Sequence, residues 1–263
     1  MKITIIGSGN IGSALVKGLL HEGTTPVGDV TLTDVEPEAF APFATKGISV
    51  MQDNVEAVKN ADMVVLCVKP YLVNIVAEDI LPALDEDTLI ISLAAGIDFF
   101  QLHRIFERRS QPLFRAIPNT AMSVCRSMTC IAASENTTPE QRRKVVDFFS
   151  RTGKAMLVDE KLMDAATILA SCGTAFALRY LSAAKAAGVE TGFRPAVAKE
   201  IVVQTMLGAA ALIAESGNHP EVEIDKVTTP GGITIKGLNE MEHAGFSSAV
   251  MTGIMAAFEK ICN

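Results

Sequence analysis

Three glycines near the N-terminus are spaced as in a loop that binds a dinucleotide. Gly7, Gly9 and Gly12 follow the apolar run ITII and open a helical pattern. A glycine turn between a strand and a helix matters because it brings the free N–H groups of the helix N-terminus up to a pyrophosphate. The alternative is a glycine turn that binds nothing, and the strand, spacing and helix together disfavour it. We therefore expect the cofactor to contact Gly7, Ser8, Gly9, Asn10, Ile11 and Gly12.

A carboxylate ends the second predicted strand. The segment VTLTD places Asp34 in the acidic position about twenty residues beyond the last glycine of the loop. A carboxylate there hydrogen-bonds the ribose hydroxyls of NAD and repels the extra phosphate of NADP, and no arginine follows it directly. Asp34 therefore favours NADH, although an aspartate that merely starts a turn is the alternative.

The ends of later strands carry further candidates, because ligands of such sheets bind outside the carboxyl ends of the strands. Asn54 follows the third strand, where its alternative role is to cap the next helix. Lys69 precedes Pro70 after the fourth strand, and its alternative is a solvated lysine. SLAAG ends the fifth strand, and Asn119 lies in a rigid turn after the sixth. Both of these could be ordinary turns.

A second loop, far along the chain, has the features of an anion site. In VTTPGGITIKGLNEME, Pro230, Gly231 and Gly232 precede a helical pattern that contains Thr234. The free N–H groups at such a helix start could hold a carboxylate, with the threonine hydroxyl near a neighbouring nitrogen or oxygen. The alternative is an ordinary loop between helices.

The first part of the chain alternates short β-branched runs with helical patterns, which is typical of a doubly wound α/β sheet. With the glycine loop, this predicts a Rossmann domain. We expect strands in ITII, VTLTD, ISVM, MVVLCV, TLIISLA, LFRAI, MTCIAA and AMLV. We expect helices at about residues 11–21, 36–46, 54–60, 72–84, 98–108 and 138–153, with Thr138 capping the last one.

From Glu160 onward the strand patterns stop, and Ala, Leu and Met recur at helical spacing. We predict a dinucleotide-binding domain over residues 1–159 and an all-helical domain of roughly five helices over residues 160–263. These helices are apolar around much of their circumference, more than an isolated bundle of this size can bury. A homodimer or higher homo-oligomer is therefore expected.

Composition disfavours several classes of protein. The formal charge of −7 and the lack of a basic run disfavour a nucleic-acid partner. The first apolar run is too short for a signal sequence, and the uncharged stretch Ala165–Leu178 is too short to span a membrane. The five cysteines have no metal-site spacing with the four histidines. We predict a cytoplasmic protein with reduced thiols, no bound metal and no membrane contact.

Together these segments resemble one family, the pyrroline-5-carboxylate reductases. GSGNIG, VKP, SLAAG and RAIPNT occur in the family's order, and VTTPGGITIKGLNEME is similar to its signature. The likeness runs from Met1 nearly to the end of the chain. It implies a Rossmann domain followed by a helical domain that interlocks with a partner subunit. It also implies reduction of the cyclic imine (S)-1-pyrroline-5-carboxylate to L-proline with NAD(P)H, the last step of proline biosynthesis.

The resemblance implies roles for individual residues. The catalytic group would be the hydroxyl of Thr234, hydrogen-bonded to the ring nitrogen. The substrate carboxylate would be bound by Thr229, Pro230, Gly231, Gly232, Ile233 and Thr234. Besides the glycine loop, the cofactor would be lined by Asn54, Val68, Lys69, Pro70, Ala95 and Asn119. A protonated imine is already electrophilic, so the protein mainly has to position it. No histidine is needed as a base, and we expect His103, His219 and His243 on solvated faces.

Some positions depart from the family pattern. In the run Ala170–Ala175, Cys172 and Thr174 stand where a serine and a proline are expected. Ala121 also replaces a proline, and Asp34 is unusual in a family that often uses NADPH. Cys172 as a nucleophile is disfavoured because no base lies near it in sequence.

The departures leave other functions open. One is a paralogous imine reductase. Another is a β-hydroxyacid dehydrogenase, for which Lys185 and Lys199 are the candidate catalytic lysines. The third is a catalytically weak, nucleotide-binding sensor.

Overall fold

The structure, a computed structural model, describes residues 1–106 and 111–262. It contains two compact units, Met1–Ser171 and Cys172–Ile261. The predicted end of the helix at residues 98–108 lies outside the described residues.

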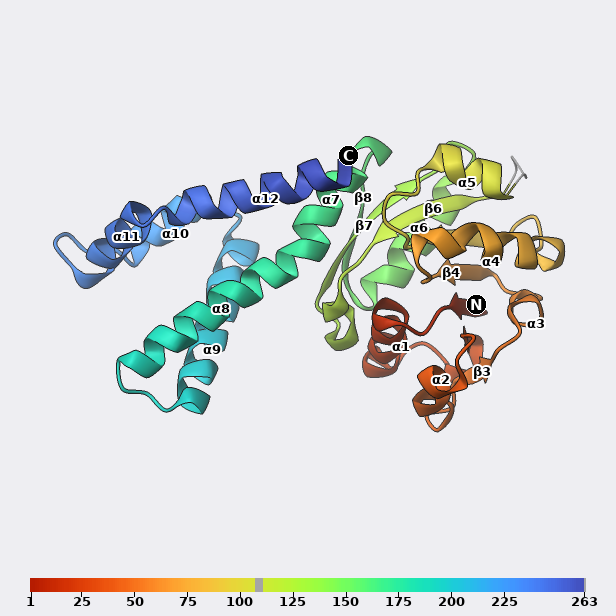
Figure 1. Ribbon diagram of the computed structural model, residues 1–263, viewed down its shortest axis with the longest axis horizontal. Coiled ribbons are helices and arrows are strands. Elements are labelled where there is room, and N and C mark those ends of the chain that lie inside the picture. The colour runs from red at the N-terminus through yellow and green to blue at the C-terminus, as the bar shows by residue number, and fades with distance from the viewer. Residues whose placement is uncertain (107–110, 263) are drawn as a thin grey trace. The chain divides into compact units, whose positions relative to one another are not determined.

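The first unit is built on one eight-stranded sheet (Figure 1). Its order is β3-β2-β1-β4-β5-β6-β7-β8, and every neighbouring pair is parallel except β6 and β7. The strands are β1 (Ile3–Ile6), β2 (Val30–Thr33), β3 (Ser49–Met51), β4 (Met63–Leu66), β5 (Leu89–Ser92), β6 (Leu113–Ile117), β7 (Ser127–Ala133) and β8 (Gly153–Leu157). This confirms the predicted doubly wound sheet and its strands.

Helices connect these strands. They are α1 (Asn10–Glu22), α2 (Pro37–Ala44), α3 (Asn54–Val58), α4 (Val73–Ile80), α5 (Phe99–Phe106) and α6 (Pro139–Ser150), with short 3-10 turns between some of them. As predicted, Thr138 caps α6, and it does so through a capping box with Gln141. The apolar faces of the helices produce two buried clusters, because successive strand side chains point to opposite faces: Ile5 belongs to one cluster and Ile6 to the other.

A long helix, Glu160–Glu190, follows the sheet. It comprises a 3-10 turn (Glu160–Leu162), α7 (Met163–Ala166), a π-helical turn (Thr167–Cys172) and α8 (Gly173–Glu190). Four more helices follow: α9 (Pro195–Ser216), α10 (Pro220–Lys226), α11 (Ile233–His243) and α12 (Phe246–Cys262). The predicted all-helical C-terminal region of about five helices is confirmed.

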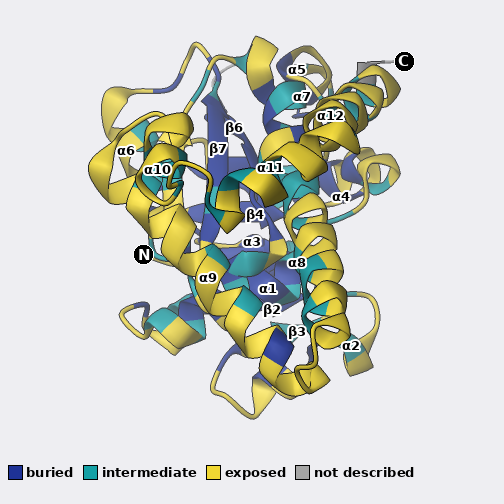
Figure 2. Cartoon of the chain, turned by 90° about the vertical axis from the view of Figure 1, so that its left-hand side faces the viewer, coloured by how far each residue is buried: buried dark blue, intermediate teal, exposed yellow. Residues whose placement is uncertain are grey.

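Many residues of α8, α9 and α12 are exposed, as their yellow colour shows (Figure 2), and large apolar side chains are among them. Leu207 is 56% exposed, Met251 61% and Ile233 92%. The helices Glu160–Glu190 and Pro195–Ser216 are long and apolar enough to cross a membrane by length and composition. The uncharged stretch Ala165–Leu178, which we predicted to be too short to span a membrane, is thus part of a longer helix. The charged residue before it, Asp164, is itself helical and does not end the helix. Apolar helices left this exposed in one chain need a covering surface.

Candidate functional site

The glycine loop after β1 leaves room for a ligand and lets α1 approach the strand closely. The Gly7 N–H donates to the Thr33 carbonyl at 2.8 Å, and Gly7 has a φ of 101°, where L side chains rarely fit. A Cβ on Gly12 would lie 1.9 Å from the Gly7 oxygen, whereas one on Gly9 would meet nothing within 4 Å. The residues therefore fit a dinucleotide, because the backbone at Gly9 is open to a pyrophosphate.

The N-terminus of α1 is suited to an anion. Its cap, Gly9, makes no side-chain cap hydrogen bond, and the first turn contains no acidic residue. The Ser13 hydroxyl instead donates to the Ser8 carbonyl at 2.5 Å, which holds the loop against the helix. The first N–H groups of α1 thus stay available to phosphate oxygens, and the helix dipole favours negative charge there.

Asp34 lies directly after β2 and is tied to the glycine loop. Its Oδ2 accepts the Ser8 N–H at 2.6 Å and the Ser8 hydroxyl at 2.8 Å, and its Oδ1 accepts the Glu36 N–H at 3.1 Å. Partial burial raises the pKa of Asp34, but the hydrogen bonds from Ser8 and Glu36 stabilise the charged form more and leave its pKa below the usual value of 3.8. The loop therefore presents a carboxylate that is charged at neutral pH.

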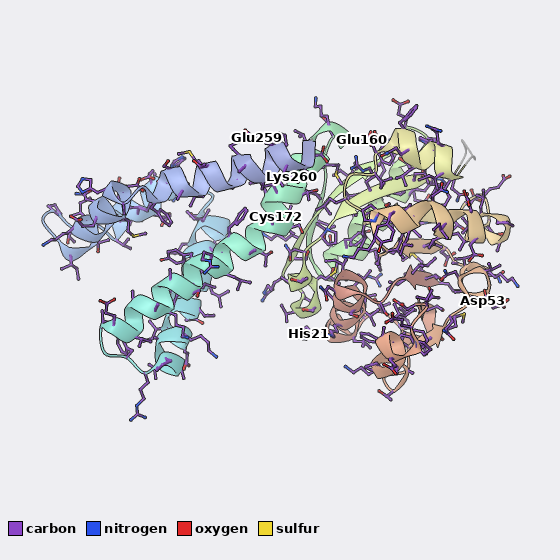
Figure 3. The ribbon with its side chains drawn as sticks, in the orientation of Figure 1. His21, Asp53, Glu160, Cys172, Glu259 and Lys260 are labelled. Carbon is purple, nitrogen blue, oxygen red and sulfur yellow. The ribbon has the colours of Figure 1, made fainter. Side chains whose placement is uncertain are left out.

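Asp53 caps α3, whereas the side chain of Asn54 contacts the end of β2. Asp53, labelled in Figure 3, caps α3 by accepting the Glu56 N–H at 2.9 Å. The interpretation of Asn54 as the cap is therefore wrong; Asn54 is the first residue of α3. Its Oδ1 accepts the Thr33 hydroxyl at 2.6 Å, across from the end of β2. Asn54 thus faces the end of the strand that precedes Asp34.

The parallel strands bring the predicted cofactor residues of the first unit to one sheet edge. β2, β1, β4, β5 and β6 run in the same direction, so the loops after their carboxyl ends meet. After β4, Val68 is half-buried, and Lys69 and Pro70 are exposed. Ala95 is exposed after β5. Their contact with a cofactor remains a prediction.

Asn119, after β6, is buried and makes four hydrogen bonds, one of them from the Met122 N–H to its carbonyl at 3.1 Å. Its N–H donates to the Ser127 hydroxyl at 3.1 Å, its Oδ1 accepts the Ala121 N–H at 3.0 Å, and its Nδ2 donates to the Ala170 carbonyl at 2.8 Å. The sequence predicted the turn but not the link to the π-helical turn, because the partners are 51 residues apart and no local pattern joins them.

The loop before α11 has the features expected of an anion site within the second unit. Gly231 has a φ of 68°, and the Gly232 N–H donates to the Thr229 carbonyl at 3.0 Å. A Cβ on Gly232 would lie 2.3 Å from the Thr229 hydroxyl, so a larger residue does not fit there. Gly232 caps α11 without a side-chain hydrogen bond, and the first turn holds no acidic residue. The exposed Thr234 is the second residue of this helix.

The histidines take different positions. His21, labelled in Figure 3, lies in the last turn of α1, and His219 and His243 are exposed, as predicted. The prediction for His103 is wrong: it is half-buried on α5, and its Nδ1 has no hydrogen-bond partner among the described residues. Its burial follows from packing beside Phe99, one turn earlier on the helix. None of this gives a base beside the glycine loop.

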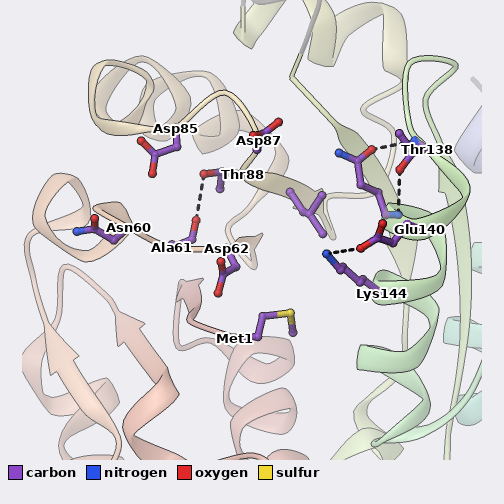
Figure 4. Close-up of a pocket in the computed structure, with 12 residues that line it drawn as sticks. Met1, Asn60, Ala61, Asp62, Asp85, Asp87, Thr88, Thr138, Glu140 and Lys144 are labelled. Carbon is purple, nitrogen blue, oxygen red and sulfur yellow. Dashed lines mark hydrogen bonds and ion pairs between the residues drawn. The ribbon is translucent and has the colours of Figure 1, made fainter.

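Two hollows lie within the first unit. One, of about 720 Å³, is lined by residues at the amino ends of strands, such as Asp62 and Thr88, and by Glu140 and Lys144 of α6 (Figure 4). The other, of about 560 Å³, lies beside His103 and Glu160. Neither hollow is lined by the glycine loop or by another residue predicted to bind the cofactor, so neither is the predicted cofactor site.

The doubly wound sheet and the open glycine loop define an oxidoreductase of the NAD(P)-binding type, with a helical C-terminal region. The chain is 36% identical over 272 residues to pyrroline-5-carboxylate reductase 2 of Dictyostelium discoideum, covering 98% of this chain and 91% of that protein. The chain belongs to the pyrroline-5-carboxylate reductase family.

Further comparisons agree with this family assignment. Residues 160–263 match the family model for pyrroline-5-carboxylate reductase dimerisation, and residues 2–96 match that for NADP oxidoreductase, coenzyme F420-dependent. Reductase 1 of D. discoideum is 36% identical over 98% of this chain, which spans 49% of that longer protein. The structure of the Plasmodium falciparum pyrroline carboxylate reductase with NADP bound has a TM-score of 0.89 at 26% identity, covering 99% of this chain and 97% of that one.

Proposed function

We propose that the protein reduces (S)-1-pyrroline-5-carboxylate to L-proline, the last step of proline biosynthesis, with NADH as the preferred cofactor. The observation that carries the proposal is the loop Thr229–Thr234, an uncapped helix start with a hydroxyl beside it, in a chain of the reductase family. The loop argues against the dehydrogenase alternative, and turnover of the imine would exclude the sensor alternative. Lys185 is half-buried and Lys199 exposed, and no described contact gives either one a catalytic partner.

The substrate carboxylate would bind the backbone N–H groups at the start of α11, where the helix dipole favours an anion. Gly232 lets the loop close tightly on Thr229, because a Cβ there would lie 2.3 Å from the Thr229 hydroxyl. The Thr234 hydroxyl would hydrogen-bond the ring nitrogen and fix the orientation of the ring. This assignment covers the loop residues Thr229, Pro230, Gly231, Gly232, Ile233 and Thr234.

The cofactor would lie along the carboxyl edge of the sheet, with its pyrophosphate on the glycine loop. Asp34 would accept the ribose hydroxyls, and the exposed Glu36 and Glu38 add negative charge nearby. A phosphate on the ribose would meet this acidic cluster, which supports NADH over NADPH. Asn54, Val68, Lys69, Pro70 and Ala95 would line the remaining edge. The turn at Asn119 would line it through its backbone only, because the Asn119 side-chain amide is bonded to Ala121 and Ala170.

The nicotinamide cofactor supplies the hydride. The chain needs no strong general base, because a protonated imine already carries its proton and accepts the hydride at carbon. The protein's contribution is then to bind the imine by its carboxylate and orient its ring, and proximity of this kind supplies much of the rate.

We propose a homo-oligomer in the cytoplasm, with no membrane contact. A second copy would cover the exposed apolar helices of the second unit, and the dimerisation match over residues 160–263 supports this. We propose that the domains meet at residues 159 and 160, where that match begins; the compact units divide a little later, after Ser171.

The test is oxidation of NADH and of NADPH by the purified protein, with and without racemic pyrroline-5-carboxylate. We expect imine-dependent oxidation that is faster with NADH at low cofactor concentration. Imine-dependent oxidation that favours NADPH would contradict the cofactor assignment alone. No oxidation with either cofactor would overturn the reductase assignment.

A further inference from the structure

The helix Glu160–Glu190 contains a π-helical turn, Thr167–Cys172, between two α-helical stretches. Such turns are rare and recur at functional sites. One extra residue in a turn rotates every following side chain by about 100° around the helix axis. The π turn therefore decides on which face of the helix the residues after Cys172 lie. They include Thr174, in the run that departs from the family pattern.

A π turn needs a reason to persist, because its hydrogen bonds are less favourable than those of an α-helix. In this chain, one carbonyl of the turn has an additional partner. The Ala170 oxygen accepts a hydrogen bond from Asn119 Nδ2 at 2.8 Å. The Thr167 hydroxyl also donates to the Met163 carbonyl at 2.8 Å. This bond weakens the backbone hydrogen bonding of the helix at the first residue of the π turn.

Asn119 is held rigidly enough to determine this contact. It is 8% exposed, and its Oδ1 accepts the Ala121 N–H while its backbone N–H donates to Ser127. The side-chain oxygen of Asn119 accepts an N–H and its side-chain nitrogen donates to a carbonyl, so exchanging the two atoms would break both bonds. The amide therefore fits in only one orientation. The bond to Ala170 is therefore a directed link from the end of β6 to the π turn.

A second tether holds the beginning of the same helix. The Glu160 carboxylate accepts Arg115 Nη1 at 3.0 Å and the Phe99 N–H at 2.6 Å. Glu160 and Cys172, both labelled in Figure 3, mark the two ends of the stretch. Met163 and Ile168 between them are buried. The helix start is thus fixed independently, so loss of the Asn119 bond would alter the turn without detaching the helix.

We propose that Asn119 is a positioning residue that maintains the π turn and thereby sets the helix register of Cys172–Ala175. Sequence resemblance suggested that Asn119 lines the cofactor; here its side-chain amide acts on the helix instead. The inference rests on the proposed reductase function only where it concerns turnover. Its effect on the helix itself does not depend on the reaction.

The discriminating variant is Asn119→Asp. An ionised carboxylate can still accept the Ala121 N–H, but it cannot donate to Ala170 and instead repels that carbonyl. Burial beside a carbonyl raises the pKa of such a carboxyl group, and the protonated form can donate again. The matched control is Ser127→Ala, which removes the hydroxyl that accepts the Asn119 N–H but keeps both side-chain bonds of Asn119, to Ala121 and to Ala170.

Three readouts are needed: the NADH dissociation constant, kcat with the imine across pH, and hydrogen exchange of a peptide covering residues 165–176. For Asn119→Asp we expect NADH affinity within about twofold of wild type and a kcat about tenfold lower at neutral pH that recovers as the pH falls. We expect faster exchange in the 165–176 peptide, whereas Ser127→Ala should lose stability without changing kcat or exchange there.

Unchanged exchange in the 165–176 peptide of Asn119→Asp would overturn the proposal, as would a kcat loss shared equally by Ser127→Ala. A weaker NADH affinity that accounts for the whole loss would show direct cofactor contact instead. If the wild-type protein does not reduce the imine, the reductase assignment fails, and exchange and NADH affinity still decide the role of Asn119.

Discussion

The backbone N–H and the hydroxyl of Ser8 both donate to one oxygen of Asp34, at 2.6 and 2.8 Å. The residue that would read the cofactor ribose therefore also holds the loop that would bind the pyrophosphate. Substitutions of Asp34 should change cofactor choice and loop stability together, because one carboxylate serves both.

Replacing Asp34 should change the cofactor preference. In Asp34→Ser the carboxylate no longer repels a ribose phosphate, so the ratio of kcat/KM for NADPH to that for NADH should rise about tenfold or more. Steady-state kinetics with both cofactors measure this. Glu38→Gln, at an exposed position in the same acidic segment, is the control and should change the ratio much less. An unaltered ratio in Asp34→Ser would remove Asp34 from cofactor selection.

The same carboxylate should contribute to acid sensitivity. The pKa of Asp34 is lower in the folded chain than its usual value of 3.8, so the folded state binds fewer protons than the unfolded state. Its contribution is therefore complete above that value and is lost as the pH falls through the lower, folded value. Urea unfolding should show wild type more stable than Asp34→Asn near neutral pH, with the difference shrinking below about pH 4. A pH-independent difference would contradict this.

Two glycines of the loop should respond differently to the same added methyl group. Gly12→Ala places its Cβ 1.9 Å from the Gly7 oxygen and should lower the free energy of unfolding by about 1–3 kcal/mol. Gly9→Ala meets no atom within 4 Å, so the fold should tolerate it while NADH binding weakens. Thermal unfolding and NADH titration separate the two effects. Equal stability losses would contradict the assignment of Gly9 to the ligand side.

Removing the Thr234 hydroxyl should impair turnover more than cofactor binding. A hydrogen bond to a charged ring nitrogen is worth about 1.5–3 kcal/mol, so Thr234→Ala should lower kcat/KM for the imine about tenfold to a hundredfold. NADH affinity should stay nearly intact. Thr234→Ser keeps the hydroxyl and should retain most of the activity. Full activity in Thr234→Ala would remove this residue from the mechanism.

The exposed apolar helices should be covered in solution. We expect light scattering on the whole protein to give at least twice the chain mass of 27.9 kDa. Dilution that produces monomers should also lower the activity per chain, because the proposed substrate loop belongs to the same helical unit. A fully active monomer would contradict the proposed assembly.

Local patterns predicted much of this fold. The strands from Ile3 to Leu157 were predictable because buried parallel strands need apolar, β-branched runs, and the Thr138 cap because its partner lies within one helical turn. The glycine loop was predictable because the spacing of its three glycines is typical of a turn between a strand and a helix. Errors arose where neighbouring residues compete: Asp53 rather than Asn54 caps α3, and the packing of α5 buries one face of His103.

The sequence alone determined the class of sheet, the candidate cofactor edge and the position of the proposed carboxylate loop, since these depend on residue type and short spacing. Tertiary structure decided which distant groups meet. Asn119 meets Ala170 across 51 residues, and Glu160 meets Phe99 across 61, because sheet order and helix docking bring those backbones together. The π turn likewise depends on packing, since no residue of Thr167–Cys172 requires it by intrinsic propensity.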